Sequence, residues 1–175
     1  MRFRYALPSA ALVLIAATTF GQAPSQKFEQ GFLDSFPMHH QEAIEMSNLC
    51  VEKATHQQLK SLCQHMATSQ TDEKQQMQSW FQSWYGGKGM APMTDMAKMK
   101  AQHELMMAKL HATSGEKFDH AMMVSMGEHH RMGIADTQKC VAQAVHPELK
   151  ALCGKMEAEQ TDDLSKMSSW IKSWK

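Results

Sequence analysis

Two adjacent histidines, His39 and His40, occur where apolar residues recur at helical spacing, and Met46 follows within two turns. Imidazole nitrogen and thioether sulfur are the donors that soft and borderline metals such as copper prefer. An apolar helix does not need two adjacent histidines for packing, although satisfied core histidines are the alternative interpretation. The pair therefore indicates a metal site, and a second pair occurs at His129 and His130.

The histidine pair occurs twice because the chain contains an internal duplication. A shift of 90 positions aligns residues 28–84 with residues 118–174 without a gap. A repeated unit usually buries its apolar face against its twin, so the two repeats are expected to pack together. The matched positions include Phe28/Phe118, His39/His129, His40/His130, Cys50/Cys140, Cys63/Cys153, His56/His146, Met77/Met167 and Trp84/Trp174.

Each repeat is expected to form two long antiparallel helices. Apolar residues recur at alternating steps of four and three in both halves of a repeat, which is the period of an amphipathic helix. A short segment around His56, or around His146 and Pro147, separates the halves. Pro147 suits the first turn of a helix, and a short connection makes the neighbouring helices antiparallel.

The four cysteines support this hairpin arrangement. No Cys-x-x-Cys pair occurs, so neither a thioredoxin-like motif nor a zinc ribbon is supported. Of the three possible connectivities we favour Cys50–Cys63 and Cys140–Cys153, because each pair lies about equally far from its turn. Each closed loop would stabilise the fold by about 3 kcal/mol.

The same antiparallel register predicts which donors share a level. Met46 is expected near Met66 and Gln70. Each hairpin should also bring a histidine, a carboxylate and a methionine together inside the fold. These trios are His39, Glu73 and Met77 in the first repeat, and His129, Asp163 and Met167 in the second.

Residues 1–23 have the pattern of a secretory signal peptide. Arg2 and Arg4 precede an apolar run from residue 10 to residue 20, which is too short to span a bilayer stably. Cleavage is expected after Gly21 or Ala23, and an uncleaved anchor is the alternative. The mature chain, residues 24–175, is expected to be a single periplasmic or secreted domain in which thiols oxidise to disulfides.

Residues 85–117 link the two repeats and are rich in methionine. Glycines at its start indicate a break, and Thr94 or Asp95 could cap a helix that ends near Thr113. Its regularly spaced sulfur donors could form a ladder for Cu(I), and a packing stripe laid over the repeats is the alternative. The candidate donors are Met90, Met93, Met96, Met99 and His103.

Composition narrows the function classes. Basic and acidic residues number 18 each, which provides no electrostatic footprint for nucleic acid or an anionic membrane. With the cysteines in disulfides, the 17 methionines and 10 histidines are the remaining soft donors, and copper, as Cu(I) or Cu(II), suits them best. No Glu-x-x-His motif, nucleophile elbow or phosphate loop suggests an enzyme.

Three motifs occur together in this chain: His39-His40-x-x-Ala43-Ile44-x-Met46, then Gln70-x-x-Glu73-x-x-x-Met77-x-x-Trp80-x-x-x-Trp84, and in the linker Gly89-Met90 with Ser114-Gly115-x-x-Phe118-Asp119. Over essentially the whole mature chain, they resemble domain-of-unknown-function family 305. The resemblance implies an all-α, ferritin-like four-helix bundle exported to the periplasm, here made of two duplicated hairpins with an extra linker helix. CopM-type members of that family bind copper through methionine and histidine and help cells to resist it.

The resemblance also implies a methionine one helical turn before each histidine pair. Met126 fills this position in the second repeat, whereas Phe36 stands there in the first, where Met38 is the substitute. The second repeat has Gly133 and Asp136 where alanine and methionine are usual, which favours the first repeat and the linker as the soft-metal sites.

The leading hypothesis is therefore a non-enzymatic copper protein that buffers copper, confers resistance to it or passes it to other periplasmic copper proteins. A non-metal structural or interaction module of the same fold is the alternative, and a metal-dependent oxidoreductase is a third. The favoured ligands are His39, His40, Met46 and Met77, with Met38, His129, His130, Met126 and Met167 as further candidates.

Overall fold

The computed structural model describes residues 23–89 and 96–174, and it contains five helices and no strand within those ranges. The all-α prediction and the predicted linker helix are thus confirmed. The expected signal peptide up to residue 22, together with Met90, Met93 and the Met96 side chain, lies outside the described part. The helices are α1 (Pro24–Lys53), α2 (Gln57–Tyr85), α3 (Met96–His111), α4 (Gly115–Gln143) and α5 (Pro147–Ser173).

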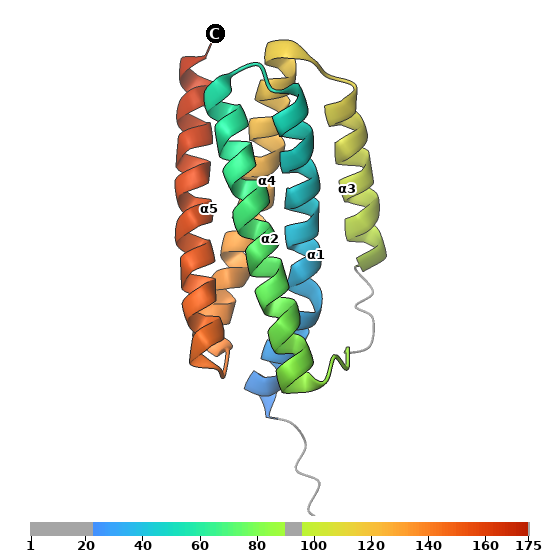
Figure 1. Cartoon of the computed structure of the whole chain (residues 1–175), viewed down its shortest axis with the longest axis vertical. Helices are drawn as coiled ribbons and strands as arrows, with labels where there is room; N and C mark the ends of the chain where they lie inside the picture. Colours follow the sequence, from blue (N-terminus) through green and yellow to red (C-terminus); the bar gives the residue numbers. More distant parts are fainter. Residues whose placement is uncertain (1–22, 90–95, 175) are drawn as a thin grey trace, which may run out of the picture.

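The two repeats form hairpins that point in opposite directions (Figure 1). The turn between α1 and α2 lies at the upper end in that view, and the turn between α4 and α5 lies at the lower end. Helix α1 packs against α4, α2 approaches α5, and α3 lies outside the four long helices. Consequently each end of the molecule combines the turn of one repeat with the open end of the other.

Both predicted disulfides are present, one in each hairpin. Cys50 is bonded to Cys63, and Cys140 is bonded to Cys153, with Cα–Cα separations of 6.0 and 6.1 Å. Because the hairpins are opposed, the first disulfide lies at the upper end and the second at the lower end. Within the described part of the chain, no helix is long and apolar enough to span a membrane.

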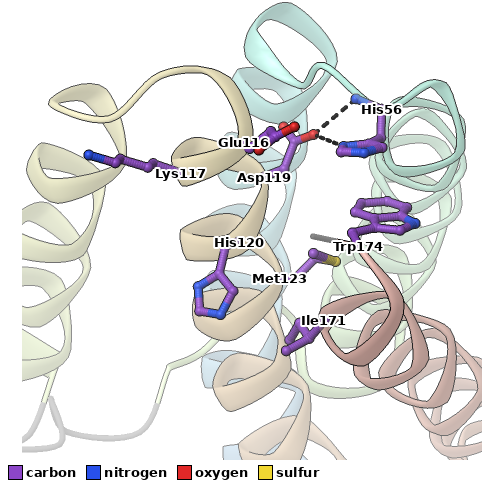
Figure 2. Close-up of a pocket in the computed structure, with 8 residues that line it drawn as sticks. All are labelled: His56, Glu116, Lys117, Asp119, His120, Met123, Ile171 and Trp174. Carbon is purple, nitrogen blue, oxygen red and sulfur yellow. Dashed lines mark hydrogen bonds and ion pairs between the residues drawn. The ribbon is translucent and has the colours of Figure 1, made fainter.

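A buried carboxylate from the second hairpin holds the turn of the first. The backbone N–H groups of Thr55 and His56 donate hydrogen bonds of 3.0 and 2.9 Å to the carboxylate of Asp119, and the His56 ring Nδ1 lies 2.6 Å from it. These N–H groups precede or begin α2, where no intrahelical partner exists. The His56 ring also stacks on Trp174 at 3.8 Å (Figure 2), so one hairpin supplies both partners for the turn of the other.

The reciprocal arrangement occurs at the other end. Val145 and His146 donate backbone hydrogen bonds of 2.7 and 2.8 Å to Glu29, and Tyr85 donates its hydroxyl to the same carboxylate at 2.7 Å. The His146 ring contacts Glu29 and stacks on Trp84 at 3.8 Å. Burial raises the pKa of Glu29, but these hydrogen bonds outweigh it and hold the pKa below its usual value.

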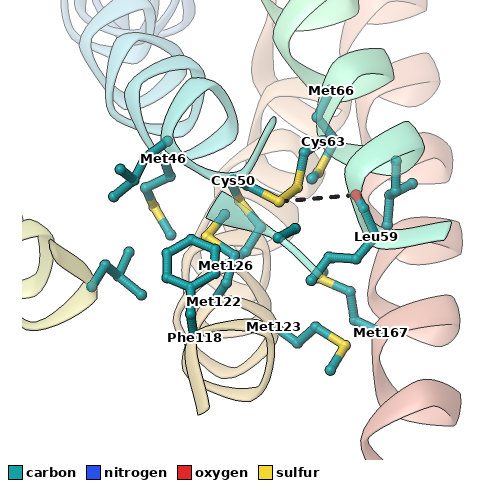
Figure 3. Packing of buried hydrophobic residues seen from close by; sticks show 14 of the residues in the cluster. Met46, Cys50, Leu59, Cys63, Met66, Phe118, Met122, Met123, Met126 and Met167 are labelled. Carbon is teal, nitrogen blue, oxygen red and sulfur yellow. Dashed lines mark hydrogen bonds between the residues drawn. A yellow bond between two sulfur atoms is a disulfide. The ribbon is translucent and has the colours of Figure 1, made fainter. Parts of the chain in front are cut away.

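Two core clusters fill the two ends of the molecule. The upper one, which we name the methionine cluster (Figure 3), surrounds the first disulfide and contains Met46, Met66, Met122, Met123, Met126 and Met167. The lower one, the aromatic cluster, surrounds the second disulfide and contains Phe32, Phe36, Met77 and Met156, with Phe28, Trp80 and Trp84 packed against it. Met46 and Met66 therefore share a cluster, as their predicted register requires.

Candidate metal centre

Four buried histidines form a layer between the two core clusters. His39 and His40 follow Phe36 of the aromatic cluster on α1, and His129 and His130 follow Met126 of the methionine cluster on α4. The rings of His39 and His129 stack across the interface of the hairpins, with centroids 3.7 Å apart. We name these four residues the imidazole layer.

The second histidine of each pair faces the carboxylate of its own hairpin. His40 Nε2 lies 3.1 Å from Glu73 Oε2, and His130 Nε2 lies 3.5 Å from Asp163 Oδ2. The predicted contacts with these carboxylates are made by the next residue along the chain, His40 instead of His39 and His130 instead of His129. A single residue turns the side chain by about 100° on a helix, so the first histidine of each pair points toward the other hairpin instead.

The hydrogen bonds of the first pair leave one nitrogen of each ring open. His39 Nε2 lies 3.3 Å from the carbonyl oxygen of His129, and a carbonyl can only accept, so Nε2 bears the proton. His40 Nε2 likewise donates to Glu73, whose other oxygen accepts from Lys155 at 3.0 Å. Metal-binding histidines commonly donate their second nitrogen to a carbonyl or carboxylate in this way.

Six ring nitrogens of the layer are buried without a hydrogen-bond partner. They are Nδ1 of all four histidines and Nε2 of His129 and His130. The amides of Gln70 and Gln160 also have unpaired buried atoms. Such atoms each cost about 1–3 kcal/mol, and a bound cation would satisfy the nitrogens.

Burial favours the neutral form of the first histidine of each pair. Burial, followed by the charge of neighbouring His129, keeps the pKa of His39 well below its usual value. Burial, followed by the charge of His130, lowers the pKa of His129 to about 3. Neutral imidazole is the form that coordinates metal, so at neutral pH these two rings need not lose a proton to bind.

The two faces of the layer differ. Met126 precedes His130 by four residues, and Met167 belongs to the same methionine cluster. On the other face, the Phe36 ring lies 5.0 Å from both His39 and His40 and covers them with an apolar surface. Met126 and Met167 of the methionine cluster therefore lie toward the upper side of the layer, whereas the Phe36 ring packs directly against its lower side, in the cluster that also contains Met77.

Two methionines that were predicted as ligands of the same site lie in different core clusters. Met46 lies in the methionine cluster, whereas Met77 lies in the aromatic cluster on the opposite side of the layer. Met38 is half-buried and belongs to neither cluster. In the linker, Met99 is exposed, and His103 lies 2.9 Å from Glu45 on α1.

The absence of a side chain at Gly133 allows a close contact within the layer. A Cβ atom there would clash with Gln160 Oε1 and lie 2.8 Å from the His39 ring. The glycine that departs from the family pattern thus lets α5 and the His39 ring approach α4. Its counterpart in the first repeat is Ala43.

No three His, Cys, Asp or Glu side chains in the described part of the chain are grouped closely enough to hold a metal ion by themselves. A separate pocket of about 380 Å³ lies beside His56, Asp119 and Trp174 at the upper end of the molecule (Figure 2), and none of the four layer histidines lines it.

Known structures with the same fold include metal-bound proteins. CopM in its silver-bound form is 25% identical, with a TM-score of 0.69, covering 83% of this chain and 96% of that one. CopM in its Cu(II)-bound form is 24% identical, with a TM-score of 0.70 and coverage of 84% and 97%. A DUF305 fragment from Deinococcus radiodurans is 19% identical, with a TM-score of 0.73 and coverage of 86% and 99%.

No curated protein matches this chain. The family described as "Domain of unknown function (DUF305)" matches residues 29–171, which is most of the sequence. The expected family resemblance is thereby confirmed. This chain belongs to the DUF305 family.

Proposed function

We propose that this protein binds copper, as Cu(I), on the methionine side of the imidazole layer, and that it buffers copper, confers resistance to it or passes it on. The ligands are drawn from the layer and from Met126 and Met167. The observation that supports this most is the set of six buried ring nitrogens that make no hydrogen bond, among them Nδ1 of all four layer histidines, in a layer that adjoins the methionine cluster.

The donor set favours Cu(I) over other ions. The disulfides leave no free thiolate in the described part of the chain, so Met sulfur and His nitrogen are the soft donors available. Zinc would favour cysteine, histidine or carboxylate in a tetrahedron, and calcium would need an oxygen cluster. Neither set is grouped within the described residues.

The relatives support the same proposal. CopM has been solved with silver, Cu(I) and Cu(II), and its silver-bound form is 25% identical to this chain. Silver(I) has the same charge and soft character as Cu(I), so a relative that binds it is expected to offer soft donors. The shared fold of these relatives also supports a proposal about the architecture. We propose that residues 24–175 form a single ferritin-like four-helix bundle.

Export of the protein is part of the proposal. Two disulfides in a chain of this size fit an oxidising compartment, and the N-terminal pattern fits a secretory signal. The protein would then meet copper in the periplasm or outside the cell, and the metal ion is its proposed partner.

The test is anaerobic competition for Cu(I) between the mature protein and a chromogenic Cu(I) chelator. The unaltered protein should withdraw Cu(I) from the chelator, and Met126→Leu or Met167→Leu should weaken its affinity by about 10-fold or more. Met156→Leu, a buried methionine of the aromatic cluster, is the matched control and should leave the affinity unchanged.

Two results would contradict the proposal. If the unaltered protein takes up no Cu(I), the chain is better explained as an interaction module whose histidines only pack. If Met77→Leu weakens binding while Met126→Leu does not, the metal lies on the aromatic side of the layer. Circular dichroism and the melting temperature of each variant separate lost binding from lost folding.

A further inference from the structure

Helix α3 places His103 at the edge of the protein core, beside α1. Lys53 on α1 donates hydrogen bonds to the carbonyl groups of Leu110 and His111, which hold the end of α3 in place. The His103 side chain is 10% exposed, and its Nε2 lies 2.9 Å from Glu45, which is 46% exposed. The other ring nitrogen of His103 is buried and has no hydrogen-bond partner.

A second carboxylate lies between this edge and the imidazole layer. Glu42, one helical turn before Glu45, is 13% exposed, and its Oε2 lies 3.6 Å from Nε2 of His129, which makes no hydrogen bond. The charge of His103 also acts on the Glu42 carboxylate, so the two groups interact. A half-buried carboxylate of this kind is stabilised by a nearby cation.

The same face of α3 also presents sulfur donors. Met99 and Met106 lie four residues before and three residues after His103, so the three side chains share one helical face. Met99 is 37% exposed, whereas Met106 packs against the methionine cluster. The donors on this face therefore extend from solvent to the core.

We propose that Glu45, His103 and Glu42 form the route by which the metal cation passes between solvent and His129 of the imidazole layer. The exposed fraction falls along the route, from 46% at Glu45 to 10% and 13% at His103 and Glu42, and to 4% at His129. The route rests on the proposed copper site, since it describes how that site is filled and emptied.

The chemistry of these groups suits passage better than storage. Carboxylates bind Cu(I) weakly, but their charge raises the local concentration of a cation. One imidazole between two carboxylates offers a single strong nitrogen donor at a time.

A route and a ligand have different signatures. A group that only assists passage lowers the barrier in both directions, so removing it slows binding and release by the same factor and leaves Kd unchanged. A ligand in the final site instead changes Kd, mainly by accelerating release. Equilibrium and kinetic measurements on the same variants therefore distinguish the two roles.

The experiment compares His103→Gln and Glu42→Gln with the unaltered mature protein, each loaded anaerobically with Cu(I). Stopped-flow mixing with an excess of chromogenic Cu(I) chelator gives the release rate, and competition at equilibrium gives Kd. We expect release to slow by about 10-fold in both variants, and Kd to stay unchanged in His103→Gln, because His103 lies outside the imidazole layer. His111→Gln, an exposed histidine at the end of α3, is the matched control and should release Cu(I) at the unaltered rate.

Each contrary outcome is distinct. Unaltered release rates in both variants would overturn the route while leaving the copper site in place. A changed Kd with faster release would show that His103 or Glu42 is a ligand, and would also overturn the route. Failure of the unaltered protein to bind Cu(I) would refute the proposed function itself. Glu45→Gln, at the exposed start of the route, should slow release without disturbing the core.

Discussion

The two ends of this molecule are built by the same repeat and differ in what fills them. At equivalent positions the methionine cluster has Met122 and Met126, and the aromatic cluster has Phe32 and Phe36. Each end nevertheless has the same disulfide and the same His–Trp stack. The fold therefore accepts phenylalanine where methionine occurs, which indicates that packing alone does not require the sulfur.

Each core cluster also combines residues of both repeats. Because the hairpins are opposed, the methionine cluster takes Met46 and Met66 from the first repeat and Met126 and Met167 from the second. The carboxylate of each hairpin faces the second histidine of its own pair, while the four rings together form one layer with two unlike faces.

Replacing core methionines of the upper end by the phenylalanines of the lower end should have the largest effect on Cu(I) affinity. Met122→Phe combined with Met126→Phe makes the upper end resemble the lower one and places an aromatic ring against the second histidine pair. Cu(I) affinity should fall by about 100-fold or more, because removing a ligand weakens binding more than removing a residue that only orients a ligand. The competition assay measures it.

The reciprocal change is the control for this exchange. Phe36→Met opens the lower face of the layer and supplies a thioether there, so the variant should bind Cu(I) at least as tightly as the unaltered protein. Both variants should retain their helical circular dichroism. Equal affinities in all three proteins would contradict a functional difference between the two faces.

Removing the disulfides tests the similarity of the two ends. Cys50→Ala/Cys63→Ala and Cys140→Ala/Cys153→Ala each open a loop of 13 residues' separation, so each should lower the free energy of unfolding by about 3 kcal/mol. Urea denaturation measures the loss. A much larger loss at one end would show that the two hairpins do not contribute equally to stability.

Acid should weaken the fold in two steps, first at the layer and then at the turns. The pKa of His129 falls from its usual 6.5 to about 3 on folding, so the unfolded chain binds more protons below pH 6.5 and stability decreases there. The pKa values of Glu29 and Asp119 are also lowered, because hydrogen bonds outweigh burial, so their stabilisation is lost as the pH falls below about 4.

Unfolding free energies measured between pH 7 and pH 3 separate these steps. His129→Gln should reduce the loss of unfolding free energy between pH 6.5 and about 4, by on the order of 2 kcal/mol at pH 5. The further loss below about pH 4 should remain. Asp119→Asn should reduce the lower step only. Unchanged stability of the unaltered protein from pH 7 to pH 5 would contradict the neutral buried layer.

Periodicity and spacing were sufficient to predict the hairpins, their disulfides and the linker helix. They could not predict which histidine of a pair faces which neighbour, because a one-residue difference turns the side chain by about 100°. Glu42 and Glu45 gave no signal, since a charged residue on a helix becomes part of a site only when another helix covers it. Here His103 of α3 contacts Glu45, and the packing of a linker helix depends on tertiary contacts.

The smallest expected effect concerns Gly133, which lies beside the imidazole layer where the first repeat has an alanine. Gly133→Ala makes the second repeat match Ala43 of the first, but its Cβ would meet Gln160 and lie 2.8 Å from the His39 ring. Because the Gln160 amide can shift, the cost should be about 1 kcal/mol, the lower end for overpacking. Displacement of His39 should be visible as a changed imidazole resonance in NMR spectra. The converse variant, Ala43→Gly, creates no such clash and should leave the His39 resonance in place, so equal shifts in both variants would show that the close approach at Gly133 does not position the ring.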